Sequence, residues 1–239
     1  MKEKDFKKFI QILKVDYSLV GVFFAEKVPR SYKKHNDTVC TALARAFLKK
    51  QASCFDGTLH RQLCRGADYY FKFENIEEKE VIKNYVKDEC VFSNKSVGEK
   101  FIQNTPKFPK KLTGKVLIIK PFMINDVPEV VALLLSPSQV GRVIGLLNYT
   151  AVDGLDVLPS QSTCISLFAP LVTGKPHINF IDYYDRYYQG VVNNKKIWPE
   201  SHMIISITYK QLCEMVANFK KSAHGSFVPK IAPQKVDNF

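Results

Sequence analysis

The sequence predicts an α+β fold, with a mixed sheet and helices packed around it and no regular doubly wound order. Three observations support this prediction. Strand-like and helix-like segments are interleaved along the chain, their order lacks a regular βαβ rhythm, and no internal repeat occurs. A chain of 239 residues is also long enough to bury a substantial core without crosslinks.

The first expected element is a helix at about residues 3–15. Apolar side chains recur there at helical spacing, at Phe6, Phe9, Ile10 and Leu13. Although the segment begins with basic residues, Asp16 interrupts the apolar passage that follows, so we interpret it as a structural helix and not as a secretion signal.

The other elements follow from apolar runs, turn residues and helix caps. Before residue 105 we expect a buried strand in SLVGVFFAE, a helix over 41–50 that Thr38 can cap, a charged helix over about 77–87, and a short helix in SVGEKFIQNT that begins at its serine. Beyond residue 115 we expect strands in KVLIIKPF, PEVVALLLS and HINFI, a helix in PSQVGRVIGLLNY with Pro137 in its first turn, an aromatic helical turn in DYYDRYYQG, and a last strand and helix in MIISITYKQLCEMVANF.

The domain organisation follows from the positions of proline. We expect a single domain over residues 1–225, with a candidate lobe boundary near 105–115, where TPKFPKKLTGK is rich in proline and lysine. Residues 226–239 contain further prolines, and we expect them to form an extended C-terminal tail.

The net charge of +12 would suit a nucleic acid or an anionic ligand. However, 29 of the 35 basic residues are lysine, and arginine is the preferred residue for phosphate and guanine recognition. We therefore interpret the charge first as a solvated surface. The longest apolar run, Val130 to Leu135, is far shorter than the about 20 residues that a membrane-spanning helix needs, so we expect a cytoplasmic protein without a membrane partner.

Six cysteines are too few for a disulfide scaffold in a chain of this length, and no paired Cys-x-x-Cys motif occurs among them (40, 54, 64, 90, 164 and 213). In a reducing compartment such thiols are core residues, metal ligands or reactive groups. Cys40 lies near the start of an expected helix, where backbone amides and the helix dipole favour a thiolate.

Cys40, Cys64 and Cys164 are the candidates for metal ligands. Gly66 permits close backbone approach beside Cys64, and Cys164 stands among small residues before an apolar helix. Scattered thiolates of this kind suit an iron–sulfur cluster, whose ligands can come from distant loops. Buried, inert cysteines remain the competing interpretation.

The segment RGADYYFKF, which follows Cys64, also resembles the stacking strand of RNA recognition domains, but its register differs. Ala67 stands where an aromatic residue is needed, and Asp68 brings a negative charge to the stacking face. No phosphate-binding glycine loop, nucleophile elbow or HExxH motif occurs either.

Several separated motifs resemble the family of uncharacterised prokaryotic proteins called DUF169, also labelled ArCR, over about residues 15–218. They are Cys40 with the helix Thr41 to Ala46, the segment Cys64 to Tyr70, Lys120-Pro121-Phe122, Pro128 to Val131, Pro137-Ser138-Gln139, Cys164 with Ala169-Pro170 and Thr173-Gly174, Asp185-Arg186, and Trp198-Pro199-Glu200. This chain departs from the family pattern at Arg65 and Ala67, where the family tends to have proline or glycine.

The resemblance implies that the thiolates of Cys40, Cys64 and Cys164 meet at one site. A 4Fe–4S cluster held by three thiolates leaves one iron free for a small substrate, for water or for a non-cysteine ligand. The alternative cofactor is zinc, in a Cys₃His site that recruits His177 as the fourth ligand. Arg186 could bind an anionic substrate, although it could equally pair with Asp182 or Asp185.

The sequence therefore favours a metal-binding protein that transfers electrons or activates a small anionic molecule, with that molecule or a redox protein as its partner. Two alternatives stay open: a basic nucleic-acid-binding module, and a thiol-dependent enzyme with Cys40 as its nucleophile. A second copy of the chain is a further candidate partner, if an apolar strand edge is exposed.

Overall fold

A seven-stranded mixed sheet forms the centre of the protein, with strand order β2-β3-β1-β4-β9-β6-β5. The structure is a computed structural model that describes residues 1–30, 32, 37–56, 64–150, 152, 154–158, 162–189, 191–192 and 195–226. Neighbouring strands are antiparallel except for β5 and β6, which are parallel. The strands are β1 Val20–Ala25, β2 Ser53–Phe55, β3 Val116–Pro121, β4 Val130–Leu135, β5 Asp156–Leu158, β6 His177–Asn179 and β9 Met203–Thr208, with β7 Val191–Val192 and β8 Lys195–Lys196 forming a separate ribbon. The predicted α+β class is confirmed.

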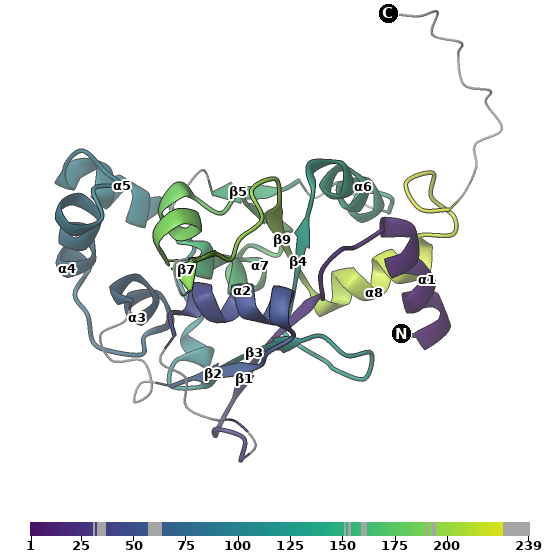
Figure 1. Cartoon of the computed structure of the whole chain (residues 1–239), viewed down its shortest axis with the longest axis horizontal. Coiled ribbons are helices and arrows are strands. Elements are labelled where there is room, and N and C mark those ends of the chain that lie inside the picture. Colours follow the sequence, from purple (N-terminus) through teal and green to yellow (C-terminus); the bar gives the residue numbers. More distant parts are fainter. Residues whose placement is uncertain are drawn as a thin grey trace, which may run out of the picture.

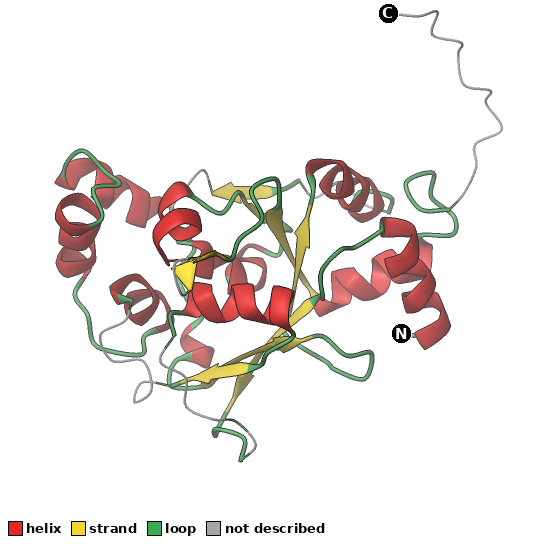
Figure 2. Ribbon diagram, in the orientation of Figure 1, coloured by secondary structure: helices red, strands yellow, loops and turns green. Residues whose placement is uncertain are grey.

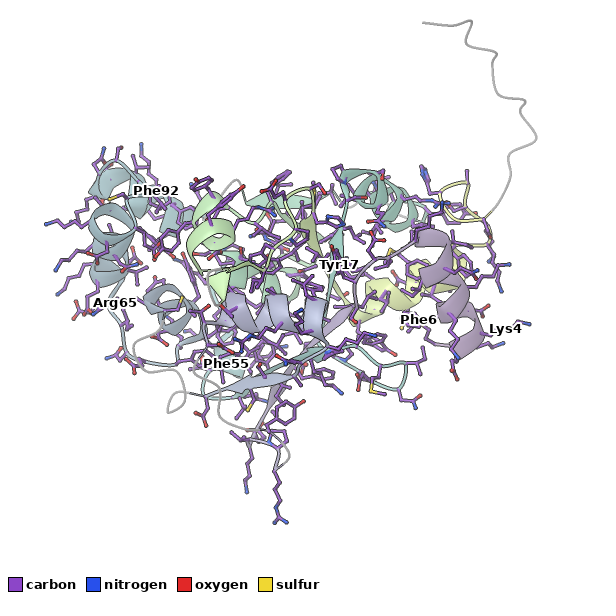
Figure 3. The ribbon with its side chains drawn as sticks, viewed as in Figure 1. Lys4, Phe6, Tyr17, Phe55, Arg65 and Phe92 are labelled. Atoms are coloured by element: carbon purple, nitrogen blue, oxygen red, sulfur yellow. The ribbon has the colours of Figure 1, made fainter. Side chains whose placement is uncertain are left out.

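Helices lie on both sides of this sheet, and two groups of them form the two ends of the molecule in the view of Figure 1 and Figure 2. At one end lie α1 Glu3–Leu13, α6 Pro137–Leu147 and α8 Tyr209–Asn218; at the other lie α3 Arg65–Phe71, α4 Glu78–Lys83 and α5 Lys95–Asn104. The remaining helical segments are α2 Val39–Lys49, α7 Ala169–Thr173, the 3₁₀ helices η2 Lys110–Leu112 and η3 Thr163–Leu167, and the π-helical turns η1 Asn84–Asp88 and η4 Asp185–Gln189. Figure 3 places the side chains of Arg65 and Phe92 at the α3–α5 end and those of Lys4 and Phe6 at the opposite end.

Strand β4 shows how the sheet divides the core into two parts. Because successive side chains of a strand point to opposite faces, an entirely apolar strand indicates burial on both faces. Val130, Ala132 and Leu134 pack in the core that includes α2 and η3, which we call the α2 side. The alternate residues of β4 pack against α1, α6 and α8, which we call the α8 side.

Several helix starts follow the caps that the sequence predicts. The Thr38 hydroxyl accepts a hydrogen bond from the Thr41 amide at 3.1 Å and so begins α2. Pro137 stands in the first turn of α6, as expected. The predicted serine cap of α5 is wrong: Asn94 precedes the helix with extended backbone, and its side chain accepts from the Val97 amide at 3.2 Å.

The candidate boundary near residues 105–115 connects parts of the chain whose strands belong to one sheet. Strands β1 and β2, which precede it, both pair with β3, which follows it. Leu112, inside the segment, is buried in the core on the α2 side. The predicted tail falls outside the described residues except for Ser226.

The two edge strands of the sheet, β2 and β5, are only three residues long each. Short edges are one way in which proteins limit edge-to-edge pairing.

In the described part of the chain, no helix combines the length and the apolar character that crossing a membrane requires.

Candidate metal centre

Three cysteines from separate elements line one pocket on the α2 side. Cys40 is the second residue of α2, Cys64 immediately precedes α3, and Cys164 lies in η3. The pocket has about 310 Å³ of space not filled by atoms, part of it open to solvent. Its other described lining residues are Gly66, Tyr85, Glu89, Ser162, Tyr184 and Asp185.

Cys40 and Cys164 form the buried part of this site, with 3% and 2% of their surface exposed. Helix α2 brings them together because it packs against both η3 and η4. The pKa of the Cys40 thiol lies well above its usual range, first because of its hydrogen bond with the Cys164 thiol and then because of burial and the negative charge of Asp185. Cys40 is therefore a protonated thiol at neutral pH, although it lies at a helix start.

Cys64 is held by the backbone of the helix that follows it. Its sulfur accepts a hydrogen bond from the Ala67 amide at 3.4 Å, so the side chain acts as the cap of α3. Burial and the neighbouring Cys164 raise the pKa of Cys64 well above its usual range, and the Ala67 amide opposes this shift. An amide already directed at the sulfur is also what a metal-bound thiolate requires.

Hydroxyl groups form another wall of the pocket. The Tyr85 hydroxyl and the Ser162 hydroxyl are 2.6 Å apart and share a buried hydrogen bond. Gly66 is small where space is short, since a Cβ atom at this position would lie 3.0 Å from the Tyr85 oxygen. A larger residue at 66 would therefore press on the hydroxyl pair.

The charged side chains that line the described part of the pocket are acidic. Asp185 is only 5% exposed, and burial raises its pKa against the opposing hydrogen bonds from Thr163 and Cys40. Glu89 accepts a hydrogen bond from the Asn84 side chain at 2.7 Å. Next to the site, burial and then repulsion by Asp185 raise the pKa of Asp182 to about 7. This surrounding favours a cation over an anion.

His177, the expected fourth zinc ligand, does not line this pocket. It lies in β6, fully buried, and its Nδ1 atom is 3.1 Å from an Asp156 carboxylate oxygen. His177 therefore pairs with a carboxylate outside the pocket. Among the lining residues that the structure describes, the three cysteines have no imidazole beside them.

Arg186, the expected anion-binding residue, is occupied by backbone carbonyls. Its Nη2 atom donates to Phe180 and to His202, both at 2.9 Å, and its Nη1 atom donates to Pro199. These contacts fasten the turn η4 to the segment that precedes β9. They favour a structural role for the guanidinium and do not point it toward the pocket.

The donor set fits a soft metal or an iron–sulfur cluster, because three thiols stand together without a basic side chain in the described lining. The present rotamers do not complete a coordination sphere: among the described residues, no three or more His, Cys, Asp or Glu side chains are arranged to hold a metal ion. Binding also requires the thiols to lose their protons, because the thiolate is the form that binds a metal.

The other cysteines lie elsewhere. Cys54 is buried in β2, Cys90 is exposed, and Cys213 is half-buried on α8. The sequence alone does not mark five of the pocket residues as such, although Asp185 belongs to one of the family motifs; they are Tyr85, Glu89, Ser162, Tyr184 and Asp185. The six cysteines are free thiols in the structure.

Comparisons with known proteins show the family. No curated protein matches the chain, and no solved structure does either. The model of the family DUF169, described as uncharacterised ArCR, matches residues 8–218. Since this match covers most of the 239 residues, the protein belongs to the DUF169 family.

Proposed function

We propose that Cys40, Cys64 and Cys164 hold a 4Fe–4S cluster, and that the protein transfers electrons to or from a redox partner protein or binds a small molecule at the cluster. The observation that supports this proposal is the meeting of three thiols from α2, the start of α3 and η3 in one pocket. When bound, such a cluster supplies one-electron redox chemistry and an iron without a cysteine ligand.

Charge neutralisation supports a metal at this position. The pKa values of the Cys40 and Cys64 thiols and of the Asp185 carboxyl group are all raised, that of Cys40 first by its hydrogen bond with Cys164 and the other two first by burial. A cationic centre stabilises buried anions, so these side chains can bind it in their deprotonated forms. The Ala67 amide, at 3.4 Å from Cys64, remains as a hydrogen-bond donor to the bound sulfur.

The same observations weigh against two other functions. A nucleophilic Cys40 needs a lowered thiol pKa, whereas that of Cys40 is raised. A Cys₃His zinc site needs His177, which pairs with Asp156 outside the pocket. The expectation of a small anionic ligand loses the support of Arg186, whose guanidinium binds backbone carbonyls.

The test compares two matched triple variants of the full chain. One replaces the pocket cysteines (Cys40→Ser, Cys64→Ser, Cys164→Ser), and the other replaces the remaining three (Cys54→Ser, Cys90→Ser, Cys213→Ser). Each protein is reconstituted anaerobically with iron and sulfide, and its visible spectrum, iron and acid-labile sulfide are measured.

We expect wild type and the second variant to turn brown with equal amounts of iron and sulfide, and the first variant to stay colourless. A colourless wild-type protein without iron after reconstitution contradicts the proposal, as does equal iron binding by both variants. If wild type and the second variant bind stoichiometric zinc in place of iron, and the first variant does not, the three cysteines are the ligands but the cofactor is zinc.

A further inference from the structure

Asp185 lies in the cysteine pocket and contacts the segments that carry two of the cysteines. It begins the turn η4, which packs against α2, and it is almost fully buried. Its Oδ2 atom accepts a hydrogen bond from the Thr163 amide at 2.9 Å, directly before Cys164 in the chain. Asp185 and Cys40 line the same pocket.

The backbone around Asp185 fixes this orientation. Its own amide donates to the Asp182 carboxylate at 2.9 Å, and the next residue, Arg186, is fastened to three carbonyl groups. The Asp185 side chain is therefore directed into the site by contacts on both sides of it in the chain.

Four other residues with oxygen or nitrogen donors, in or near the pocket, have hydrogen-bond partners of their own. The Glu89 carboxylate accepts from Asn84, the Tyr85 and Ser162 hydroxyls bond to each other, and His177 bonds to Asp156. Among the described residues that line the pocket, Asp185 is the carboxylate that accepts a hydrogen bond from the backbone amide directly before a pocket cysteine, Cys164.

We infer that Asp185 is the fourth ligand of the site, binding through a carboxylate oxygen to the iron that no cysteine holds. This inference rests on the proposed function. Asp185 binds this iron as its carboxylate. A carboxylate is a harder ligand than a thiolate and suits iron–sulfur chemistry less well, so this iron is the one that is lost or exchanged most easily.

The experiment uses the full chain after anaerobic reconstitution, as wild type, Asp185→Cys, Asp185→Asn and Glu89→Gln. Glu89→Gln is the matched control, because it removes the other carboxylate of the same pocket. Limited ferricyanide then takes one electron from the cluster and is reduced to ferrocyanide, and the labile iron leaves as Fe²⁺ to give a 3Fe–4S cluster. Released iron and the electron paramagnetic resonance signal of the 3Fe–4S product are measured, and circular dichroism checks that each variant is folded.

We expect wild type and Glu89→Gln to lose one iron of four, and Asp185→Cys to keep all four because a fourth thiolate holds the iron. Asp185→Asn should still assemble a cluster on three cysteines but change the spectrum of its reduced form. If Asp185→Asn fails to fold, the resistance of Asp185→Cys to iron loss decides the matter.

Two failures can be told apart. If wild type holds a four-iron cluster and Asp185→Cys loses iron as wild type does, Asp185 is not a ligand and the proposed function stands. If wild type assembles no cluster, the proposed function fails, and the role of Asp185 fails with it.

Discussion

The two sides of the central sheet are built on different principles. The α8 side is apolar and locally regular: Phe9, Leu212 and Phe219 are fully or almost fully buried there, and α6 and α8 both begin with capping boxes. The α2 side buries thiols, carboxyl groups and hydroxyls. In the part of the chain that the structure describes, the hydroxyls of Ser166 and Ser206 and the indole N–H of Trp198 are buried on this side without a hydrogen-bond partner.

Burying a polar group without a partner is unfavourable, so the α2 side gives up stability that the α8 side does not. Unfavourable burial is typical of sites whose groups have a task beyond packing. The α8 side therefore contributes packing alone, whereas the α2 side combines a large apolar core with the buried polar groups of the candidate site. The predictions below test that division.

The largest effect is expected from Phe9→Ala on the α8 side. Phe9 is fully buried and packs edge-on against Phe219, with ring centroids 6.0 Å apart. We expect the free energy of unfolding, measured by urea denaturation, to fall by about 3–5 kcal/mol. Iron incorporation below the unfolding transition should not change. A loss of iron binding by the folded variant would contradict the division between the sides.

Thiol reactivity should differ strongly between cysteines in the metal-free protein. Cys90 is exposed, whereas Cys40 is buried with a raised pKa. Since one pKa unit changes the thiolate fraction tenfold, we expect iodoacetamide to modify Cys90 at least about tenfold faster than Cys40 at pH 7.5. Raising the pH should speed up the reaction of Cys40 as its thiolate forms. Mass spectrometry of timed samples measures both rates, and preferential labelling of Cys40 at neutral pH would support a nucleophile instead.

The hydroxyl pair in the pocket should contribute a smaller, measurable amount. Tyr85→Phe removes one member of the 2.6 Å hydrogen bond and leaves Ser162 buried without that partner. We expect the free energy of unfolding to fall by about 1–2 kcal/mol. Tyr149→Phe, at a position that is 44% exposed, is the control and should change it little. In a double-mutant cycle with Ser162→Ala, additive losses would show that the two hydroxyls are not coupled.

The smallest effect is expected at Asp68 in α3, where a substitution should stabilise the protein. Burial, and then repulsion by Glu74, raise the pKa of Asp68 from 3.8 to about 7. The folded state therefore binds a proton more tightly than the unfolded state, and stability falls as the pH rises from about 4 to about 7. Asp68→Asn removes this loss. After allowing for solvent screening, we expect Asp68→Asn to raise the free energy of unfolding by about 1 kcal/mol at pH 8, which corresponds to a melting temperature higher by about 2–4 °C.

The control for this prediction has the opposite sign. The control residue is Asp156, whose pKa is lowered by its hydrogen bond with His177. The charged form of Asp156 therefore stabilises the fold above the usual pKa of aspartate. Asp156→Asn should therefore lower the melting temperature at neutral pH. Thermal unfolding followed by circular dichroism at pH 5 and pH 8 measures both variants, and a gain for Asp68→Asn that is as large at pH 5 would contradict the titration argument.

The sequence predicted the long, patterned elements well. The helices α1, α2, α6 and α8 and the strands β1, β3, β4 and β9 carry a clear period or a cap, and all are present. Strands β2 and β5, three residues long each, were missed. Helix α3 was missed as well, since nearly all its side chains are buried and so no amphipathic face marks it.

The candidate site was predictable only in part. No local pattern brings Cys40, Cys64 and Cys164 together, and it was the family resemblance that implied a common site. The expected fourth ligand, His177, was chosen for its closeness to Cys164 in sequence. Asp185 reaches the pocket because η4 packs against α2, and that contact between distant segments has no signature in sequence spacing.

The three cysteines lie in segments that are far apart along the polypeptide, at positions 40, 64 and 164. Anything that binds all three therefore acts as a crosslink that closes one short and one very long loop. Such closure restricts the unfolded chain, much as a disulfide of equal span does. A group that binds only the folded protein also raises its stability, so occupancy of the site and resistance of the fold to heat or proteases rise together. The melting temperature then reports how fully the site is occupied.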